Sequence, residues 1–197
     1  KANNWWGPAG KTGPCGPDSE MFYFVGKKLS KGSNPETKPD EWREIWNDVF
    51  MEYDKKEDGS YAPLEKKNVD TGMGVERTIA VLNGLEDDYL TEAFWPALEK
   101  LEKLTGKKYK KAGKEEKKAF RIIADHLKAG TFIFAEKIAP GNVERGYVLR
   151  RLIRRAVRYG NLLGLKKSFT KQIAEVYIEL YKEDYPELEK NKLFILE

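Results

Sequence analysis

The chain has 197 residues, 40% of them hydrophobic and 12% aromatic, with 36 Lys and Arg against 32 Asp and Glu. This composition supports a packed core in one large or two small domains and excludes wholesale disorder. No apolar run approaches the roughly 18 residues of a membrane span. Cys15 and His126 are the single residues of their types, too few for a disulfide or a His/Cys zinc site. We therefore expect a cytoplasmic protein without a metal site.

The opening stretch WWGPAGKTGPCGPDSE, residues 5–20, contains a Gly-Lys-Thr triplet that begins at Gly10. A phosphate-binding P-loop requires a glycine at the position that Trp5 occupies. The three prolines of the stretch also lack the backbone N–H groups that cradle phosphate. The sequence therefore predicts a stiff loop here and excludes a P-loop.

The segment up to residue 86 has the spacing of strands and turns. The aromatic run 20–25 and the alternating run 42–56 predict strands, and Asp58-Gly59 predicts a turn. Residues 68–84 are typical of a strand end, a glycine-rich bend and a helix closed by Asn83-Gly84. Alternation in the run 42–56 predicts one strand face made of Ile45, Asn47, Val49, Met51 and Tyr53.

From residue 87 onward the apolar residues recur about every three and a half positions, the period of amphipathic helices. Four apolar stripes begin at Leu90, Phe120, Tyr147 and Phe169, and Pro96 is expected to kink or restart the first helix. The Lys-rich stretch 105–118 predicts an exposed connector. The sequence thus predicts an α+β fold, with a sheet-bearing part at 1–86 and a helical part at 87–197.

Two polar features of the first part are candidate ligand contacts. Asn47 interrupts an apolar strand face, where an unpaired buried amide would cost about 1–3 kcal/mol. By position alone, a core amide satisfied by the backbone is the better explanation. In VDTGMGVER, Gly72 and Gly74 permit close backbone approach, Asp70 precedes the bend, and Arg77 can fork onto a phosphate. The alternative is a plain strand-to-helix turn with a surface ion pair.

The segment from Arg145 to Arg158 carries six arginines and no acidic residue. One face of a helix here would bury Val148, Leu149, Leu152, Ile153, Ala156 and Val157. The other face would carry Arg150, Arg151, Arg154, Arg155 and Arg158. Solvated helix faces usually mix both signs of charge, so an arginine-only face favours contact with a polyanion such as nucleic acid.

Four stretches resemble the alanyl-tRNA synthetases, a family of class II aminoacyl-tRNA synthetases. They are NWWGPAGKTGPCGPDSE, EIWNDVFMEY, VDTGMGVER and RIIADHLKAGTFIFAEKIAPGNVERGYVLRRLIRRAVRYGNLLG, and they follow the family's order between residues 4 and 164. The resemblance implies part of an antiparallel catalytic domain with motif 3 at 1–86, and the first portion of a helical tRNA-recognition domain at 87–197. It implies ATP-dependent activation of alanine, with Mg²⁺ accompanying the ATP, and transfer to tRNA(Ala).

The same resemblance assigns residues to two adjoining sites. The alanine site would be formed by Trp6, Asn47, Asp70 and Gly72. The ATP site would be formed by Asp70, Gly72, Gly74 and Arg77. Within these sets, Asp70 would receive the ammonium, Asn47 the carboxylate, and Arg77, the implied catalytic residue, an ATP phosphate.

In the helical part, the resemblance implies that Asn142 identifies a G·U pair of the acceptor stem from the minor groove. A side-chain amide suits this task because it both donates and accepts hydrogen bonds. The backbone phosphates would be held by Arg150, Arg151, Arg154 and Arg155. His126 is expected to be a structural helix residue.

Several parts of the family's pattern are not found in the sequence. Motifs 1 and 2 would precede Lys1, an acidic partner of the tRNA-recognition region would follow Glu197, and the editing domain is missing. Asp18 stands where the family often has a second cysteine. We therefore expect an internal piece of a synthetase, inactive alone and completed by the remainder in the same or a second chain. The alternative is a standalone or split-enzyme RNA-binding module.

Overall fold

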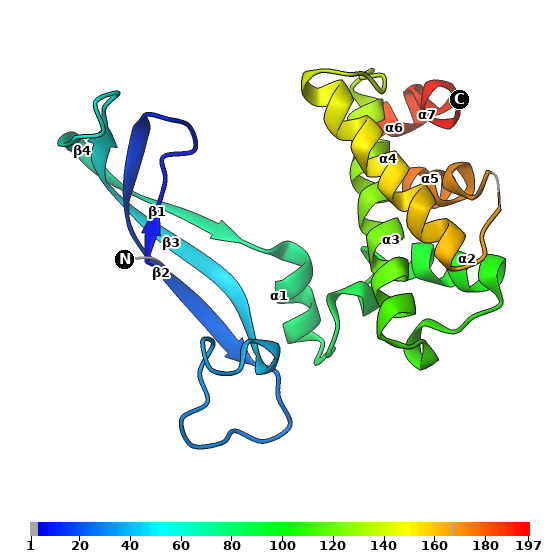
Figure 1. Cartoon of the computed structure of the whole chain (residues 1–197), viewed down its shortest axis with the longest axis horizontal. Coiled ribbons are helices and arrows are strands. Elements are labelled where there is room, and N and C mark those ends of the chain that lie inside the picture. Colours follow the sequence, from blue (N-terminus) through cyan, green and yellow to red (C-terminus); the bar gives the residue numbers. More distant parts are fainter. Residues whose placement is uncertain (1–3, 167) are drawn as a thin grey trace. The chain divides into compact units, whose positions relative to one another are not determined.

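The computed structural model describes residues 4–166 and 168–197. The chain separates into two compact units, Lys1–Asp88 and Tyr89–Glu197. The first, here the sheet unit, carries the strands, and the second, the helical unit, carries most of the helices (Figure 1). The predicted α+β organisation is confirmed. Within the described residues, no helix is both long and apolar enough to cross a membrane.

The sheet unit is built on four antiparallel strands in the order β1-β2-β3-β4. Their bounds are β1 (Trp5–Trp6), β2 (Gly13–Phe24), β3 (Trp42–Lys55) and β4 (Tyr61–Met73). β3 and β4 form a hairpin whose turn contains Gly59 at φ +84, in the left-handed region that favours glycine. Asp58 closes this turn by accepting a hydrogen bond from the Ser60 amide at 2.9 Å. A short helix, α1 (Val75–Leu82), follows β4 directly.

β2 begins earlier than the sequence predicts. The expected strand starts at residue 20, whereas the observed one starts at Gly13 and includes part of the proline-rich stretch. Gly16 explains how this stretch lies so close to β3, because a Cβ there would stand 1.9 Å from the Phe50 carbonyl oxygen. Pro14 and Pro17 mask the strand in the sequence, since proline usually marks a loop or a sheet edge.

The helical unit packs its helices around a common apolar core. The helices are α2 (Trp95–Thr105), α3 (Lys114–Ala135), α4 (Glu144–Leu162), α5 (Phe169–Tyr181), α6 (Pro186–Lys190) and α7 (Lys192–Leu196). Leu98, Phe120, Ile123, Ala156 and Ile173, from α2 to α5, are each fully buried in the main core. The long helices α3 and α4 lie side by side (Figure 1). The four predicted apolar stripes thus supply the core.

Two details of the helical part differ from the prediction. The first stripe is not one helix, because Pro96 stands in the first turn of α2 and Leu90 belongs to a separate 3-10 turn. The Lys-rich stretch is not a wholly exposed connector either. Tyr109 lies within it at 1% exposure, packed edge-on against Phe120 at 5.7 Å, and α3 already begins at Lys114.

The buried face of α4 is narrower than expected. Leu149, Ala156 and Gly160 are buried, whereas Val148 and Val157 are 49% and 38% exposed. The buried positions lie on a single line along α4, where Leu149 faces α3 and Gly160 packs against Phe169 of α5. Val148 and Val157 lie about 100° of helix rotation to either side of that line, where the side chain reaches solvent.

Candidate functional site

One face of the sheet unit gathers several acidic side chains. Residues directly opposite one another in neighbouring strands project from the same face of a sheet. The pairing forms two adjacent rows across β2, β3 and β4, namely Asp18–Val49–Asp70 and Glu20–Asn47–Gly72. We call the face that these six residues share the carboxylate face.

Asn47 and Asp70 lie diagonally across this face. Asn47 pairs with Gly72, two residues from Asp70 along β4, which corresponds to a separation of about 7–8 Å. Val49, directly opposite Asp70, shares this face and is 5% exposed. Asp70 is exposed and has no hydrogen-bond or ion-pair partner among the described residues. Its carboxylate is therefore available to a ligand.

An irregularity in β3 adds Glu44 to the carboxylate face. Met21 pairs with Trp46, but the next residue of β2, Phe22, pairs with Glu44, so Ile45 is bulged out of the register. A bulge shifts the alternation of side chains by one position. Glu44 therefore projects from the same face as Glu20, and its Oε2 accepts a hydrogen bond from Arg77 Nη1 at 3.1 Å.

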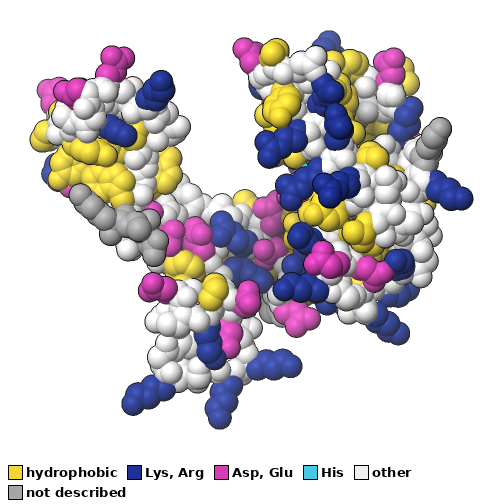
Figure 2. Space-filling model, in the orientation of Figure 1, with side chains coloured by type: hydrophobic (Ala, Val, Ile, Leu, Met, Phe, Trp, Pro, Cys, Tyr) yellow, Lys and Arg dark blue, Asp and Glu magenta, His cyan; other side chains and the backbone are white. Residues whose placement is uncertain are grey.

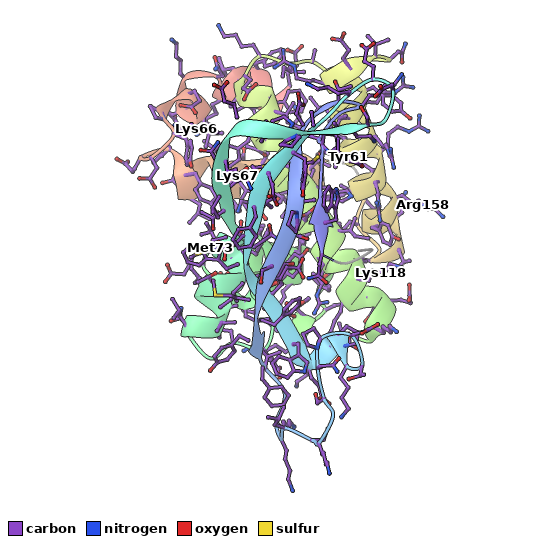
Figure 3. All side chains as sticks on the ribbon, turned by 90° about the vertical axis from the view of Figure 1, so that its left-hand side faces the viewer. Tyr61, Lys66, Lys67, Met73, Lys118 and Arg158 are labelled. Carbon is purple, nitrogen blue, oxygen red and sulfur yellow. The ribbon has the colours of Figure 1, made fainter. Side chains whose placement is uncertain are left out.

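Gly74 allows Arg77 to fold back over the bend between β4 and α1. A Cβ at position 74 would stand 2.6 Å from Arg77 Nε and 3.0 Å from Nη2. At Gly72, by contrast, an added Cβ would meet nothing within 4 Å. The Arg77 guanidinium therefore packs closely against the backbone at Gly74, one of the two glycines expected to permit such an approach. Gly72 faces open space on the carboxylate face. Figure 3 labels Met73, which lies between them at the end of β4.

The carboxylates of the carboxylate face repel one another, which favours the approach of a cation. Loss of water raises the pKa of Glu20, and the charges of Glu44 and Asp18 raise it further. A hydrogen bond from Asn47 and the charge of Arg77 act in the opposite direction without cancelling the rise. Carboxylates that crowd one another in this way are stabilised when a positive group approaches. No group of three His, Cys, Asp or Glu within the described residues is arranged to hold a metal ion.

The Asn47 amide is not buried in the sheet but donates along the carboxylate face. Its Nδ2 donates to Asp18 Oδ2 at 3.1 Å. Asp18 Oδ1 is shielded from solvent and has no hydrogen-bond partner among the described residues. Asp18, Glu20 and Glu44 were not among the predicted site residues. Their signals in the sequence are weak, because charged residues on a strand are usually solvated and only the register places these three beside Asn47.

Trp6 lies at the edge of the sheet, where it pairs with Gly16. Trp6 is 38% exposed. Its pairing partner Gly16 lies two residues before Asp18 in β2, so alternation places Gly16, and Trp6 opposite it, on the same face as Asp18. The neighbouring Trp5 belongs to a separate aromatic cluster, stacked on Tyr53 at 5.8 Å and edge-on to Tyr61 at 5.6 Å. Of these two neighbouring tryptophans, Trp6 is the one on the side of the carboxylate face.

The helical unit presents the second candidate site. Its predicted residues are all exposed on or just before α4, namely Asn142, Arg150, Arg151, Arg154 and Arg155. Arg150 Nη1 donates a hydrogen bond to Asn142 Oδ1, which joins the amide to the arginine face. Gly146 makes the tight entry into α4 possible, since a Cβ there would stand 2.8 Å from the Ala139 carbonyl oxygen. Figure 2 shows Lys and Arg side chains gathered over this unit.

Comparisons with known proteins identify the family to which the chain belongs. A family model described as tRNA synthetases class II (A) matches residues 1–197. An alanine–tRNA ligase from Treponema pallidum (strain Nichols) is 49% identical over 193 residues, which is 96% of this chain and 32% of the relative. An alanine–tRNA ligase from Thermotoga maritima is 43% identical over the whole chain and 23% of its own length. The chain therefore spans at most about a third of these relatives, and it belongs to the class II tRNA synthetases (A).

Proposed function

We propose that the chain is part of an alanine–tRNA ligase. It would contribute to the ATP-dependent conversion of alanine to alanyl-adenylate, with Mg²⁺ entering alongside ATP, and to transfer of the alanyl group to tRNA(Ala). The observation that carries the proposal is the shared position of Asn47 and Asp70 on the carboxylate face. Two polar groups about 7–8 Å apart suit the two ends of a very small zwitterion.

Each end of alanine has a chemically matched partner in this proposal. The exposed Asp70 carboxylate, with no partner of its own among the described residues, would receive the ammonium. Asn47 would donate to the carboxylate, exchanging part of its present hydrogen bonding to Asp18. Trp6 would wall the alanine site, and Gly72, open on this face, would leave room for the substrate.

ATP would occupy the neighbouring end of the face. Arg77 would bind a phosphate, and its fork is already oriented by Glu44 at 3.1 Å and by the close packing on Gly74. A planar guanidinium held in this way can stabilise charge that develops on phosphate during adenylate formation. Arg77 is the chain's proposed catalytic residue.

The helical unit would bind the acceptor stem of tRNA(Ala). Asn142 would contact the G·U pair through the minor groove, and Arg150, Arg151, Arg154 and Arg155 would contact backbone phosphates. With Asn142 Oδ1 accepting from Arg150, the amide N–H groups are directed away from that bond and are available as donors. Phosphate contacts add affinity, while the amide adds the choice of base pair.

The decisive test is alanine-dependent exchange of pyrophosphate into ATP. We expect exchange from the complete enzyme and none from the 197 residues alone, because motifs 1 and 2 are not identified in them. The remainder of the synthetase, including the editing domain, would lie in the same or a second chain. Exchange by the isolated chain would overturn the proposed incompleteness. A complete enzyme that activates a different amino acid in preference to alanine would overturn the proposed substrate.

A standalone or split-enzyme RNA-binding module is the second candidate function. The observation that favours it is the exposed arginine face of α4, which needs no part of the sheet unit. Binding of an acceptor-stem hairpin, with no activation in any combination of chains, would support this reading. Salt-independent hairpin binding would count against it, because phosphate contacts release counterions.

A further inference from the structure

A second basic surface lies at the start of α3, outside the residues assigned above. An open hollow of about 720 Å³ is lined by Ala112, Lys114, Lys117, Lys118, Arg121 and Ile122. Four of these six residues are cationic and none is acidic. We call this surface the α3 basic hollow.

The spacing of the cations along α3 places like charges next to one another in the hollow. Lys114 and Lys118, like Lys117 and Arg121, are four residues apart on a helix, where like charges repel. They also lie near the helix N-terminus, which disfavours cations. Lys114 and Lys118 form no ion pair with the described residues, and the nearby Glu116 is already paired with Lys107. A bound anion would relieve this repulsion.

Arg121 is held in place for binding. Its Nε donates to Tyr109 Oη at 2.7 Å, and its guanidinium lies 5.5 Å from the centre of the Tyr89 ring. Tyr109 is itself 1% exposed, so this support is anchored in the core. A cation whose rotamer is fixed in advance loses less entropy when it binds a phosphate.

The α3 basic hollow lies level with the C-terminal end of the arginine face of α4. An added Cβ at Gly130 in α3 would lie 3.5 Å from Leu149 Cδ1 in α4, so these residues face each other. The helices run in opposite directions, and moving nine residues along each brings Arg121 and Arg158 to the same level along the pair. Nine residues are two and a half turns, so each side chain is turned away from the other helix. Figure 3 shows Lys118 and Arg158 on the same side of the helical unit. α4 is about 28 Å long, so the hollow lies about that distance from Asn142 along the helix axis.

We propose that the α3 basic hollow binds the phosphate backbone of duplex RNA, about one helix length away from the base pair that Asn142 would contact. The inference rests on the proposed RNA binding by the helical unit and extends it to a second element. Its cations face no base-reading amide in the hollow. The hollow therefore adds affinity and orientation, not sequence choice.

The test compares two double variants of the 197-residue chain. Lys114→Gln/Lys118→Gln removes two charges from the hollow, and Lys171→Gln/Lys190→Gln removes two exposed charges from α5 and α6. The probe is an acceptor-stem RNA hairpin titrated at several salt concentrations. On duplex DNA, each neutralised phosphate contributes about 0.9 to the slope of log affinity against log salt. If each lysine contacts one phosphate, the first variant should therefore reduce the magnitude of that slope by about 1.8. The control should leave the slope unchanged.

The outcomes separate this inference from the proposed function. If wild-type binding is flat with salt, the proposed RNA binding itself fails. If wild-type binding depends on salt but the two variants behave alike, only the role of the α3 basic hollow is overturned. Thermal unfolding supplies a second readout, since removal of like charges should leave the Tm equal or higher. A lowered Tm with weaker binding would assign the two lysines to folding and overturn the inference.

Discussion

Replacing Gly74 with alanine should displace the Arg77 guanidinium without unfolding the sheet unit. The new Cβ would stand 2.6 Å from Arg77 Nε, whereas a relaxed contact is about 3.5 Å, so the guanidinium must retreat by roughly 0.9 Å. That movement would disrupt the 3.1 Å ion pair between Arg77 and Glu44, whose side chains are 41% and 29% exposed, respectively. An exposed pair contributes only about 0–1 kcal/mol to folding. A 1 Å displacement of a group that orients a reactant, however, costs about 10²-fold in rate.

The assay is pyrophosphate exchange by the complete enzyme, with ATP and alanine varied separately. We expect kcat/KM for ATP to fall by about 10²-fold, with a much smaller change in the KM for alanine. The matched control is Gly113→Ala, because an added Cβ there meets nothing within 4 Å. Unchanged dependence on ATP would refute the link between Gly74 and Arg77. A large drop in the Tm of the 197-residue chain would instead give Gly74 a folding role.

Four further substitutions test the remaining assignments. In the complete enzyme, Asp70→Asn should raise the KM for alanine far more than that for ATP, and an equal rise would remove Asp70 from the ammonium site. Asn142→Ala should reduce the preference for a G·U over a G·C stem in aminoacylation, and an unchanged preference would move that role elsewhere. The pKa of Glu20 is higher in the folded protein than in the unfolded chain. Protonated Glu20 therefore favours folding below its unfolded-state pKa, and this contribution is lost as the pH rises through its folded-state pKa. Glu20→Gln should therefore raise the Tm at pH 7 but not below about pH 4, and equal Tm values at pH 7 would contradict the reasoning. Tyr177→Phe should cost about 1 kcal/mol in urea unfolding, since Tyr177 Oη donates to the Ala124 carbonyl at 2.9 Å; no change in the midpoint would contradict it.

The helical unit shows what apolar spacing can and cannot predict. The stripes that begin at Phe120 and Phe169 correspond to α3 and α5 because a 3.6-residue period brings each stripe to one side of a helix. The period does not report how wide the contact with a neighbouring helix is. Val148 and Val157 of α4 are exposed for this reason. Nor does local composition reveal that Tyr109, within a run of lysines, is a core residue, since its partner Phe120 lies in a different element.

In the sheet unit, the side-chain period of a strand predicts which residues alternate, but the pairing register between strands decides which face they share. Alternation in β3 correctly groups Asn47 with Val49, because a strand has a side-chain period of two. By the same period, Glu44 would lie on the opposite face, away from Arg77. The bulge at Ile45 reverses that placement, and no local signal marks it, since a bulge depends on how two strands align. The pairing of Glu44 with Arg77 is thus a consequence of strand register. Periodicity therefore predicts the elements of this chain, whereas the register between strands determines which of their side chains share a face.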